Sequence, residues 1–290
     1  MNVGSDICKD FKVVKKLGNG SFGVVYLALH KETHVEYAIK AEPLYTLAPQ
    51  LRHEARLLAR LAGKHVPRVY KYRSDAQYNF LVMQYMGMSL ESIREVCPHI
   101  FTPNTLCALA IKVFDALEHV HANGIIHRDI KPDNILLGRK KHNVYLIDFG
   151  LAKEYVHPRT KVHIPYKDGK HLTGTARFAS IRTHLGIESS RRCDLETLGY
   201  VLVYLGKGSL PWQGIKCKNK EEKYNKIMEK KIACPLDKLC EGLPPGIILY
   251  LEYCRDRLQF DETPDYNYLR GLFGMPDEIE WCKYIGCCHT

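Results

Sequence analysis

Two short polar stretches have residue types and a spacing suited to catalysis. The first is His127-Arg128-Asp129-Ile130-Lys131-Pro132-Asp133-Asn134, and Asp148-Phe149-Gly150 begins nineteen positions after Asp129. Phosphoryl transfer needs a carboxylate beside the attacking hydroxyl, oxygen ligands for magnesium, and cations around the phosphates. We predict that Asp129 accepts the hydroxyl proton and that Lys131 reaches the transferred phosphate. Asn134 and Asp148 are predicted to bind Mg²⁺, a hard cation that prefers oxygen.

Each stretch alone also fits an ordinary loop or turn, because short polar tripeptides are common in proteins. Here both occur in this order, and an apolar run precedes each of them. The combination favours the catalytic interpretation.

A glycine-rich turn and a lysine after it predict a nucleotide site. Gly18-Asn19-Gly20-Ser21-Phe22-Gly23 lies between two strand-like segments, residues 11–17 and 24–29. β-Branched residues follow the turn, so it joins two strands and does not open a dinucleotide-binding helix. Glycines allow the backbone to approach phosphates without a Cβ clash. Lys40, in the next predicted strand (35–42), suits the α and β phosphates, although a lysine at a strand end is often only an exposed surface residue.

Residues 49–62 predict a helix, and Glu54 lies beside its apolar face. Glu54 is the expected ion-pair partner of Lys40, a pair that would orient the lysine. The alternative is a local helical ion pair of Glu54 with Arg52 or Arg56.

Two more predicted strands, residues 68–72 and 78–83, complete a β-rich first part, and the segment after them is the expected hinge beside adenine. The residues expected around ATP are Leu17, Gly18, Gly20, Ser21, Phe22, Gly23, Val25, Ala38, Lys40, Met83, Gln84 and Met86.

The remainder of the chain has mainly helical patterns. A helix is predicted from residues 102–103 to Asn123, a buried helix over 194–205, and a last group of helices after 242–246. Short strands at 135–137 and 144–147 are expected to place Asn134 and Asp148 face to face. The fold class is therefore α+β.

Composition limits the class of protein. The chain has 290 residues, a formal charge of +10 and eleven cysteines, and those cysteines are scattered without a Cys-x-x-Cys pair. This pattern argues against a disulfide framework or a zinc finger and predicts a reduced, intracellular protein. No run of apolar residues is long enough to cross a bilayer, and residues 1–6 lack the core of a signal peptide. Residues 151–192 hold nine Lys/Arg and three Asp/Glu, a net charge of +6, which suggests an acidic partner.

The chain resembles the eukaryotic protein kinases over its whole length. The glycine turn, Lys40, Glu54, Asp129, Asn134 and Asp148 match that family in order, and Lys131 resembles its serine/threonine branch. A closer likeness is to the casein kinase 1 family. It is carried by the blocks at residues 163–166, 172–181, 183–188, 208–214 and 264–270, such as Gly208-Ser209-Leu210-Pro211-Trp212-Gln213-Gly214.

The resemblance implies a bilobal fold in one kinase domain, residues 1–290. We expect a β-rich N-terminal lobe (1–83), a hinge (84–88) and a mainly helical C-terminal lobe (89–290) with a short tail from about residue 278. It also implies ATP and Mg²⁺ as cofactors, serine or threonine as acceptor, and a preference for acidic or phosphate-primed protein substrates. Activity is expected without phosphorylation of the activation segment, the stretch that contains Thr160, Thr173 and Thr175.

The family's substrate anion site maps onto Arg177, Gly214 and Lys223, with Lys170 nearby. Phosphate suits arginine, which can donate two parallel hydrogen bonds to it. Two departures affect this expectation. Lys223 follows the acidic pair Glu221-Glu222. Arg182 stands where the family has Asn, so the sequence leaves open how the end of the activation segment is anchored.

Other functions were weighed against catalysis. A pseudokinase or phosphopeptide-binding scaffold would be expected to lack Lys40, Asp129 or Asp148, and all three are present. Nucleic-acid binding is disfavoured because aromatic residues do not alternate with the basic ones. We expect a monomer in the cytoplasm or nucleus, with membrane association only if Cys287 and Cys288 are lipidated.

Overall fold

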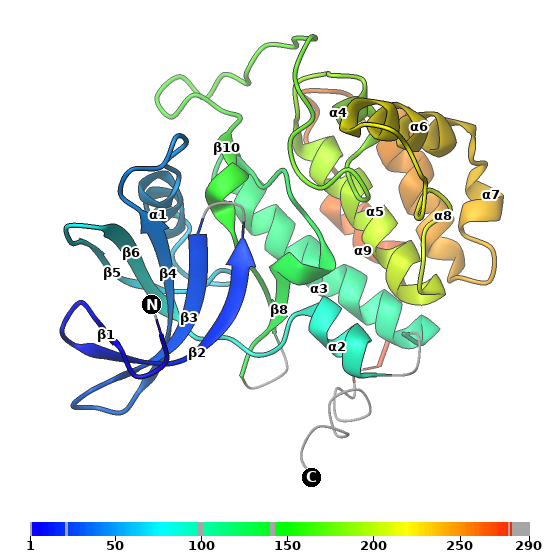
Figure 1. Ribbon diagram of the computed structural model, residues 1–290. Coiled ribbons are helices and arrows are strands. Elements are labelled where there is room, and N and C mark those ends of the chain that lie inside the picture. The colour runs from blue at the N-terminus through cyan, green and yellow to red at the C-terminus, as the bar shows by residue number, and fades with distance from the viewer. Residues whose placement is uncertain (1, 21–22, 98–100, 140–142, 278, 280–290) are drawn as a thin grey trace. The chain divides into compact units, whose positions relative to one another are not determined.

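A computed structural model describes residues 2–20, 23–97, 101–139, 143–277 and 279 of the protein (Figure 1). The chain forms two compact units. The first contains the residues up to Gly87 together with Tyr145–Gly150, and the second contains Met88–Val144 and the residues from Leu151 onward. In the part of the chain that the structure describes, no helix is both long and apolar enough to span a bilayer.

The first unit contains an antiparallel sheet of six strands in the order β1-β2-β3-β4-β6-β5. The strands are β1 (Asp6–Ile7), β2 (Phe11–Gly20), β3 (Gly23–His30), β4 (Glu36–Pro43), β5 (Val69–Ser74) and β6 (Tyr78–Gln84). One helix, α1 (Leu51–Arg60), contacts β5 and β6.

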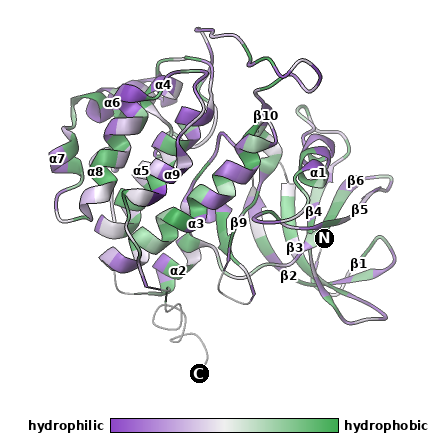
Figure 2. Ribbon diagram, turned by 180° about the vertical axis from the view of Figure 1, so that it is seen from behind, coloured by the Kyte–Doolittle hydropathy of each residue, from purple (hydrophilic) through white to green (hydrophobic). Residues whose placement is uncertain are grey.

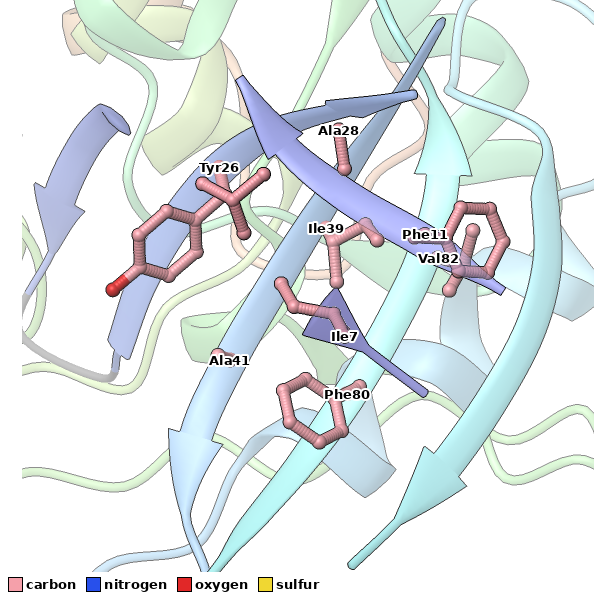
Figure 3. Close-up of a cluster of buried hydrophobic side chains, with 9 residues drawn as sticks. Ile7, Phe11, Tyr26, Ala28, Ile39, Ala41, Phe80 and Val82 are labelled. Atoms are coloured by element: carbon pink, nitrogen blue, oxygen red, sulfur yellow. The ribbon is translucent and has the colours of Figure 1, made fainter. Parts of the chain in front are cut away.

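One face of this sheet carries a buried apolar cluster (Figure 3). Its members recur at every second position of their strands, as in Ile39 and Ala41 of β4 and in Phe80 and Val82 of β6. The register pairs Ile39 with Val82 and Ala41 with Phe80, so these side chains meet across strands. Because strand side chains alternate between faces, the residues between them, including Lys40, point to the opposite face.

The second unit is mainly helical. Its helices are α2 (Leu90–Val96), α3 (Pro103–Ala122), α4 (Ile181–His184), α5 (Arg191–Lys207), α6 (Lys220–Ala233), α7 (Leu236–Leu239), α8 (Pro245–Glu252) and α9 (Tyr266–Gly271). Shorter elements are η1 (Pro132–Asn134), η2 (Phe149–Leu151), which begins in the first unit, and the π-helical turn η3 (Tyr253–Arg257). The short strands are β7 (Ile125–Ile126), β8 (Ile135–Leu137) and β10 (Lys153–Glu154), and β7 pairs with β10. Strand β9 (Val144–Leu146) begins in the second unit and continues into the first.

Helix α3 begins as its sequence predicts. Thr102 accepts a hydrogen bond from the backbone N–H of Thr105, Pro103 occupies the first turn, and Asn123 caps the end. The hydrophobic residues along α3 and the hydrophilic residues along α6 are visible in Figure 2. Helix α5 packs against α3 and α8, and a Cβ at Gly199 would lie 2.3 Å from Leu251 Cδ2, so α5 and α8 approach closely there.

The sheet followed by helices confirms the predicted α+β class and agrees with the bilobal kinase fold. The predicted helix 49–62 is shorter in the structure, because Gln50 is its N-cap and Leu61 its C-cap. The buried helix predicted from residue 194 begins earlier, at Arg191. Helix α2, capped by Ser89, was not predicted.

Candidate active site

Lys40 lies between two carboxylates in the first unit. Its Nζ donates to Glu54 Oε2 and to Asp148 Oδ1, each at 2.7 Å. Lys40 and Glu54 are buried, whereas the Asp148 side chain is partly exposed. Burial lowers the pKa of Lys40, but the two carboxylates outweigh it and hold that pKa above its usual range. The lysine is therefore a cation with a fixed position.

Local folding sets these positions. Lys40 projects from β4 on the face opposite the Figure 3 cluster, and Glu54 is one of the buried residues of α1. The backbone N–H of Phe149 donates to Glu54 Oε1 at 3.2 Å. Asp148 has φ 63°, a left-handed conformation that is uncommon outside glycine and often found at functional sites. Glu54 thus pairs with Lys40 as predicted.

The strands around Lys40 bring together several residues expected at ATP. Val25 lies opposite Lys40, and Ala38 lies opposite Met83. At Gly23, with φ +148°, a Cβ would lie 2.3 Å from the backbone oxygen of Ala41, so this position requires glycine.

The other residues expected at ATP are also in the first unit, apart from two outside the described residues. Leu17 is exposed and Met86 is buried. Gly18 and Gly20 lie on β2 and Gln84 ends β6. Ser21 and Phe22 lie outside the described residues.

Asp129 is the centre of a hydrogen-bond cluster in the second unit. Its Oδ2 accepts from Lys131 Nζ at 2.7 Å, and its Oδ1 accepts from Thr175 Oγ1 at 2.8 Å. Asn134 Nδ2 donates to the backbone oxygen of Asp129 at 2.9 Å and to its Oδ2 at 3.3 Å. The structure therefore brings together three residues that the sequence singled out, and it adds Thr175.

A buried aspartate on α5 holds the loop before Asp129. Asp194 accepts the backbone N–H of His127 at 2.7 Å and that of Arg128 at 2.8 Å. Its Oδ2 also lies 3.0 Å from His121 Nε2. Burial would raise the pKa of Asp194, but the interactions with His121 and His127 hold it below its usual value. The aspartate stays ionised and fixes the loop backbone.

A protein-family comparison agrees with this geometry. Residues 11–242 match the protein kinase domain. The chain belongs to the protein kinase domain family. Kinases of this family in general use ATP with Mg²⁺ and act on protein substrates.

The donor atoms fit magnesium at a kinase site. Asp148 offers a carboxylate, and the hydrogen bonds of Asn134 Nδ2 leave its amide oxygen as the ligand atom. Among the described residues, no group of three or more His, Cys, Asp or Glu forms a ready cation site. At phosphate-transfer sites Mg²⁺ is commonly held by one or two protein oxygens together with phosphates and water. Asn134 and Asp148 belong to different units, so their facing arrangement stays a prediction.

Two positions of the candidate site had only weak signals in the sequence. Gly174 has φ +88°, and a Cβ there would lie 2.3 Å from the backbone oxygen of Arg128. The backbone at Gly174 therefore lies directly on the loop that carries Asp129. Thr175 follows and bonds to Asp129. The Thr173-Gly174-Thr175 sequence was the available signal, but it does not indicate which distant residue Thr175 meets.

The four residues expected at the anion site do not all have the same surroundings. Arg177 is exposed, and its guanidinium carbon lies 5.6 Å from the ring centroids of Phe178 and Tyr204. Gly214 and Lys223 are also exposed, and Lys223 is on α6. Lys170 instead pairs with Glu188, with its Nζ 3.6 Å from Oε2.

Glu222, one acidic neighbour of Lys223, interacts with other groups. Glu222 pairs with Lys226 at 2.8 Å and accepts the backbone N–H of Lys218 at 3.0 Å. These interactions lower the pKa of Glu222 and direct its charge to the start of α6.

Arg182 holds the end of the activation segment, which the sequence had left open. Its Nη2 donates to the backbone oxygen of Arg255 at 2.5 Å, and its Nη1 lies 3.7 Å from Glu196 Oε2. Glu196 also accepts the backbone N–H of Ile181 at 2.8 Å. The segment end is thus fixed to α5 and η3.

Proposed function

We propose that this kinase is a serine/threonine protein kinase of casein kinase 1 type, which transfers the γ-phosphate of ATP to acidic or phosphate-primed proteins. The observation that carries the proposal is the cluster around Asp129. A carboxylate held from both sides by Lys131 and Thr175 is suited to receive a hydroxyl group rather than merely to stabilise a loop.

In the proposed reaction, Asp129 orients the serine or threonine hydroxyl and accepts its proton. The oxygen of that hydroxyl forms the new bond to phosphorus as the bond to the leaving diphosphate breaks. Lys131 keeps a positive charge beside the transferred group, and Thr175 prevents Asp129 from rotating away from the acceptor.

We assign nucleotide binding to the first unit. Lys40, oriented by Glu54, binds the α and β phosphates, and the glycine turn covers them. Asp148 and Asn134 are the proposed magnesium ligands. When bound, the metal neutralises charge on the phosphates.

The substrate class is argued from charge and from the resemblance of the activation segment to casein kinase 1. Arg177 presents an exposed guanidinium supported by two aromatic rings. A phosphoserine carries nearly two negative charges and three acceptor oxygens, which an arginine can bind bidentately. We propose that Arg177 and Lys223, with Gly214, bind such a group three residues before the acceptor. Lys170 is less suited to bind this phosphate because it already pairs with Glu188.

The test is phosphate transfer to two matched peptides, one with phosphoserine three residues before the acceptor and one unphosphorylated. Wild-type protein, Arg177→Ala and Asp129→Asn are compared, with Arg159→Ala as the control because Arg159 is an exposed cation of the same segment. We expect the wild type and Arg159→Ala to prefer the primed peptide, and Arg177→Ala to lose that preference.

Asp129→Asn should lower kcat on both peptides by about 100-fold or more, because general base catalysis typically contributes that much. Transfer without a preference would remove the primed-substrate part of the proposal. ATP binding without transfer to any peptide would favour the pseudokinase.

A further inference from the structure

Three carbonyl groups around Arg177 are bonded to side chains from elsewhere in the second unit. Lys231 Nζ donates to the backbone oxygens of Ala176 at 2.9 Å and Ala179 at 2.5 Å. Trp212 Nε1 donates to the backbone oxygen of Arg177 at 2.7 Å. The backbone of residues 176–179 is therefore held on one side while the Arg177 side chain stays exposed. We call these two donors the carbonyl clamp.

Lys231 is a buried cation-forming group that phosphate transfer does not use. Its side chain is 0% exposed, although it belongs to the strongly charged helix α6. Nζ lies 4.9 Å from the centroid of Tyr200 and 5.2 Å from that of Trp212, with His184 Nε2 at 3.2 Å. A buried lysine is unfavourable unless it is paired or hydrogen-bonded. Here its hydrogen bonds go to the segment that carries Arg177.

The clamp does not depend on the charge of Lys231. Burial lowers the pKa of Lys231, and the attraction of Glu196 opposes this effect. An ammonium has three N–H donors and a neutral amine has two. Either form can therefore donate to both Ala176 and Ala179.

The clamp is continuous with the anchor at Arg182. Glu196 Oε1, which accepts the backbone N–H of Ile181, also accepts the hydroxyl of Tyr200 at 2.7 Å. The Tyr200 ring in turn faces Lys231. Residues 176–182 are thus held along their length by groups of α5 and α6 and by Trp212 of the connection between them.

We propose that Lys231 is a positioning residue for substrate selection: through the backbone of residues 176–179 it sets the place of the Arg177 guanidinium. This inference rests on the proposed function, in which Arg177 binds the priming phosphate. It adds that selectivity depends on a buried residue of α6, fifty-four positions away in the sequence. Arg177 would contact the substrate, and Lys231 would act only through it.

The main test is Lys231→Met, which keeps an unbranched side chain of similar length but removes every N–H donor. We expect KM for the primed peptide to rise about tenfold or more, while kcat and the KM for the unprimed peptide stay within about threefold. Lys220→Met is the matched control, because Lys220 is an exposed lysine of the same helix whose Nζ lies 5.5 Å from the ring centroid of Tyr224. It should behave like the wild type.

A double variant separates positioning from general structural damage. If Lys231 acts through Arg177, then Lys231→Met in the Arg177→Ala background should change the primed-to-unprimed ratio less than twofold. A parallel loss of kcat on both peptides, or an equal loss of the ratio in both backgrounds, would overturn the proposal. Unaltered selectivity in Lys231→Met would overturn it as well.

Trp212→Phe provides a milder test if Lys231→Met does not fold, because it removes one N–H donor and keeps an aromatic ring. We expect a smaller rise in KM, in the same direction and for the primed peptide only. The wild type is measured first. A wild type that transfers phosphate without preferring the primed peptide would refute the primed-substrate proposal itself, and with it the selectivity assigned to Lys231. A selective wild type with an equally selective Trp212→Phe would refute the clamp alone.

Discussion

Acid should destabilise this protein through His184 before most carboxylates titrate. The imidazole Nε2 of His184 lies 3.1 Å from the backbone oxygen of Ala176 and 3.2 Å from Lys231 Nζ. Burial, together with the positive charge of Lys231, lowers the pKa of His184 from 6.5 to about 4. The folded protein therefore favours the neutral imidazole.

The sign follows from proton binding. Between pH 6.5 and about 4 the unfolded chain binds a proton at His184 that the folded protein does not, so the free energy of unfolding falls as the pH falls. Each pH unit corresponds to about 1.4 kcal/mol for one proton, so the full window corresponds to about 3 kcal/mol. This is a large fraction of a typical stability of about 5–15 kcal/mol.

The assay is urea unfolding, followed by circular dichroism, at pH values from 7.5 to 4.5. His184→Gln should lose less stability than the wild type over this range, because the amide keeps a donor for Ala176 and does not titrate. His171→Gln, at an exposed histidine, is the control and should follow the wild type. The reasoning is refuted if His184→Gln and the wild type lose stability in parallel between pH 6.5 and 4.5.

Two further substitutions test the contacts that support the loop and the segment. Gly174→Ala should lower kcat at least tenfold and reduce the melting temperature, because its Cβ would collide with the backbone oxygen of Arg128. Gly169→Ala, also at a positive φ but with open space around the Cβ position, should retain kcat; equal effects of the two would argue against the collision. Asp194→Ala should destabilise the protein by roughly 3 kcal/mol in urea unfolding, because one buried and one partly buried backbone N–H group lose their acceptor. A loss below about 1 kcal/mol would show that other groups hold the loop.

Sequence patterns were sufficient to predict the position of a residue where its own strand, helix or loop determines that position. The strand that carries Lys40 and the buried face of α1 follow from strand and helix patterns, so the pairing of Lys40 with Glu54 could be predicted. The same is true of Asp129, Lys131 and Asn134, which lie within six residues of one another.

Contacts between residues that are far apart in the sequence could not be predicted. Thr175 reaches Asp129 across 46 positions, and no periodicity encodes that distance. Arg182 finds its acceptors on η3, whose π-helical turn has no clear sequence signature. Lys231 belongs to a helix with charged residues on all sides, so the residue pattern does not predict that its side chain is buried.

The assignment of Tyr145–Gly150 to the first unit has a consequence for dividing this protein into fragments. The first unit is built from two separate pieces of chain. A fragment ending at Gly87 would lack Asp148, a partner of Lys40, and the Phe149 N–H that Glu54 accepts. No single cut of the polypeptide releases either unit whole. A split version of the protein must therefore supply Tyr145–Gly150 to the half that carries the first unit, and truncation at Gly87 should yield a fragment that lacks part of the proposed nucleotide site.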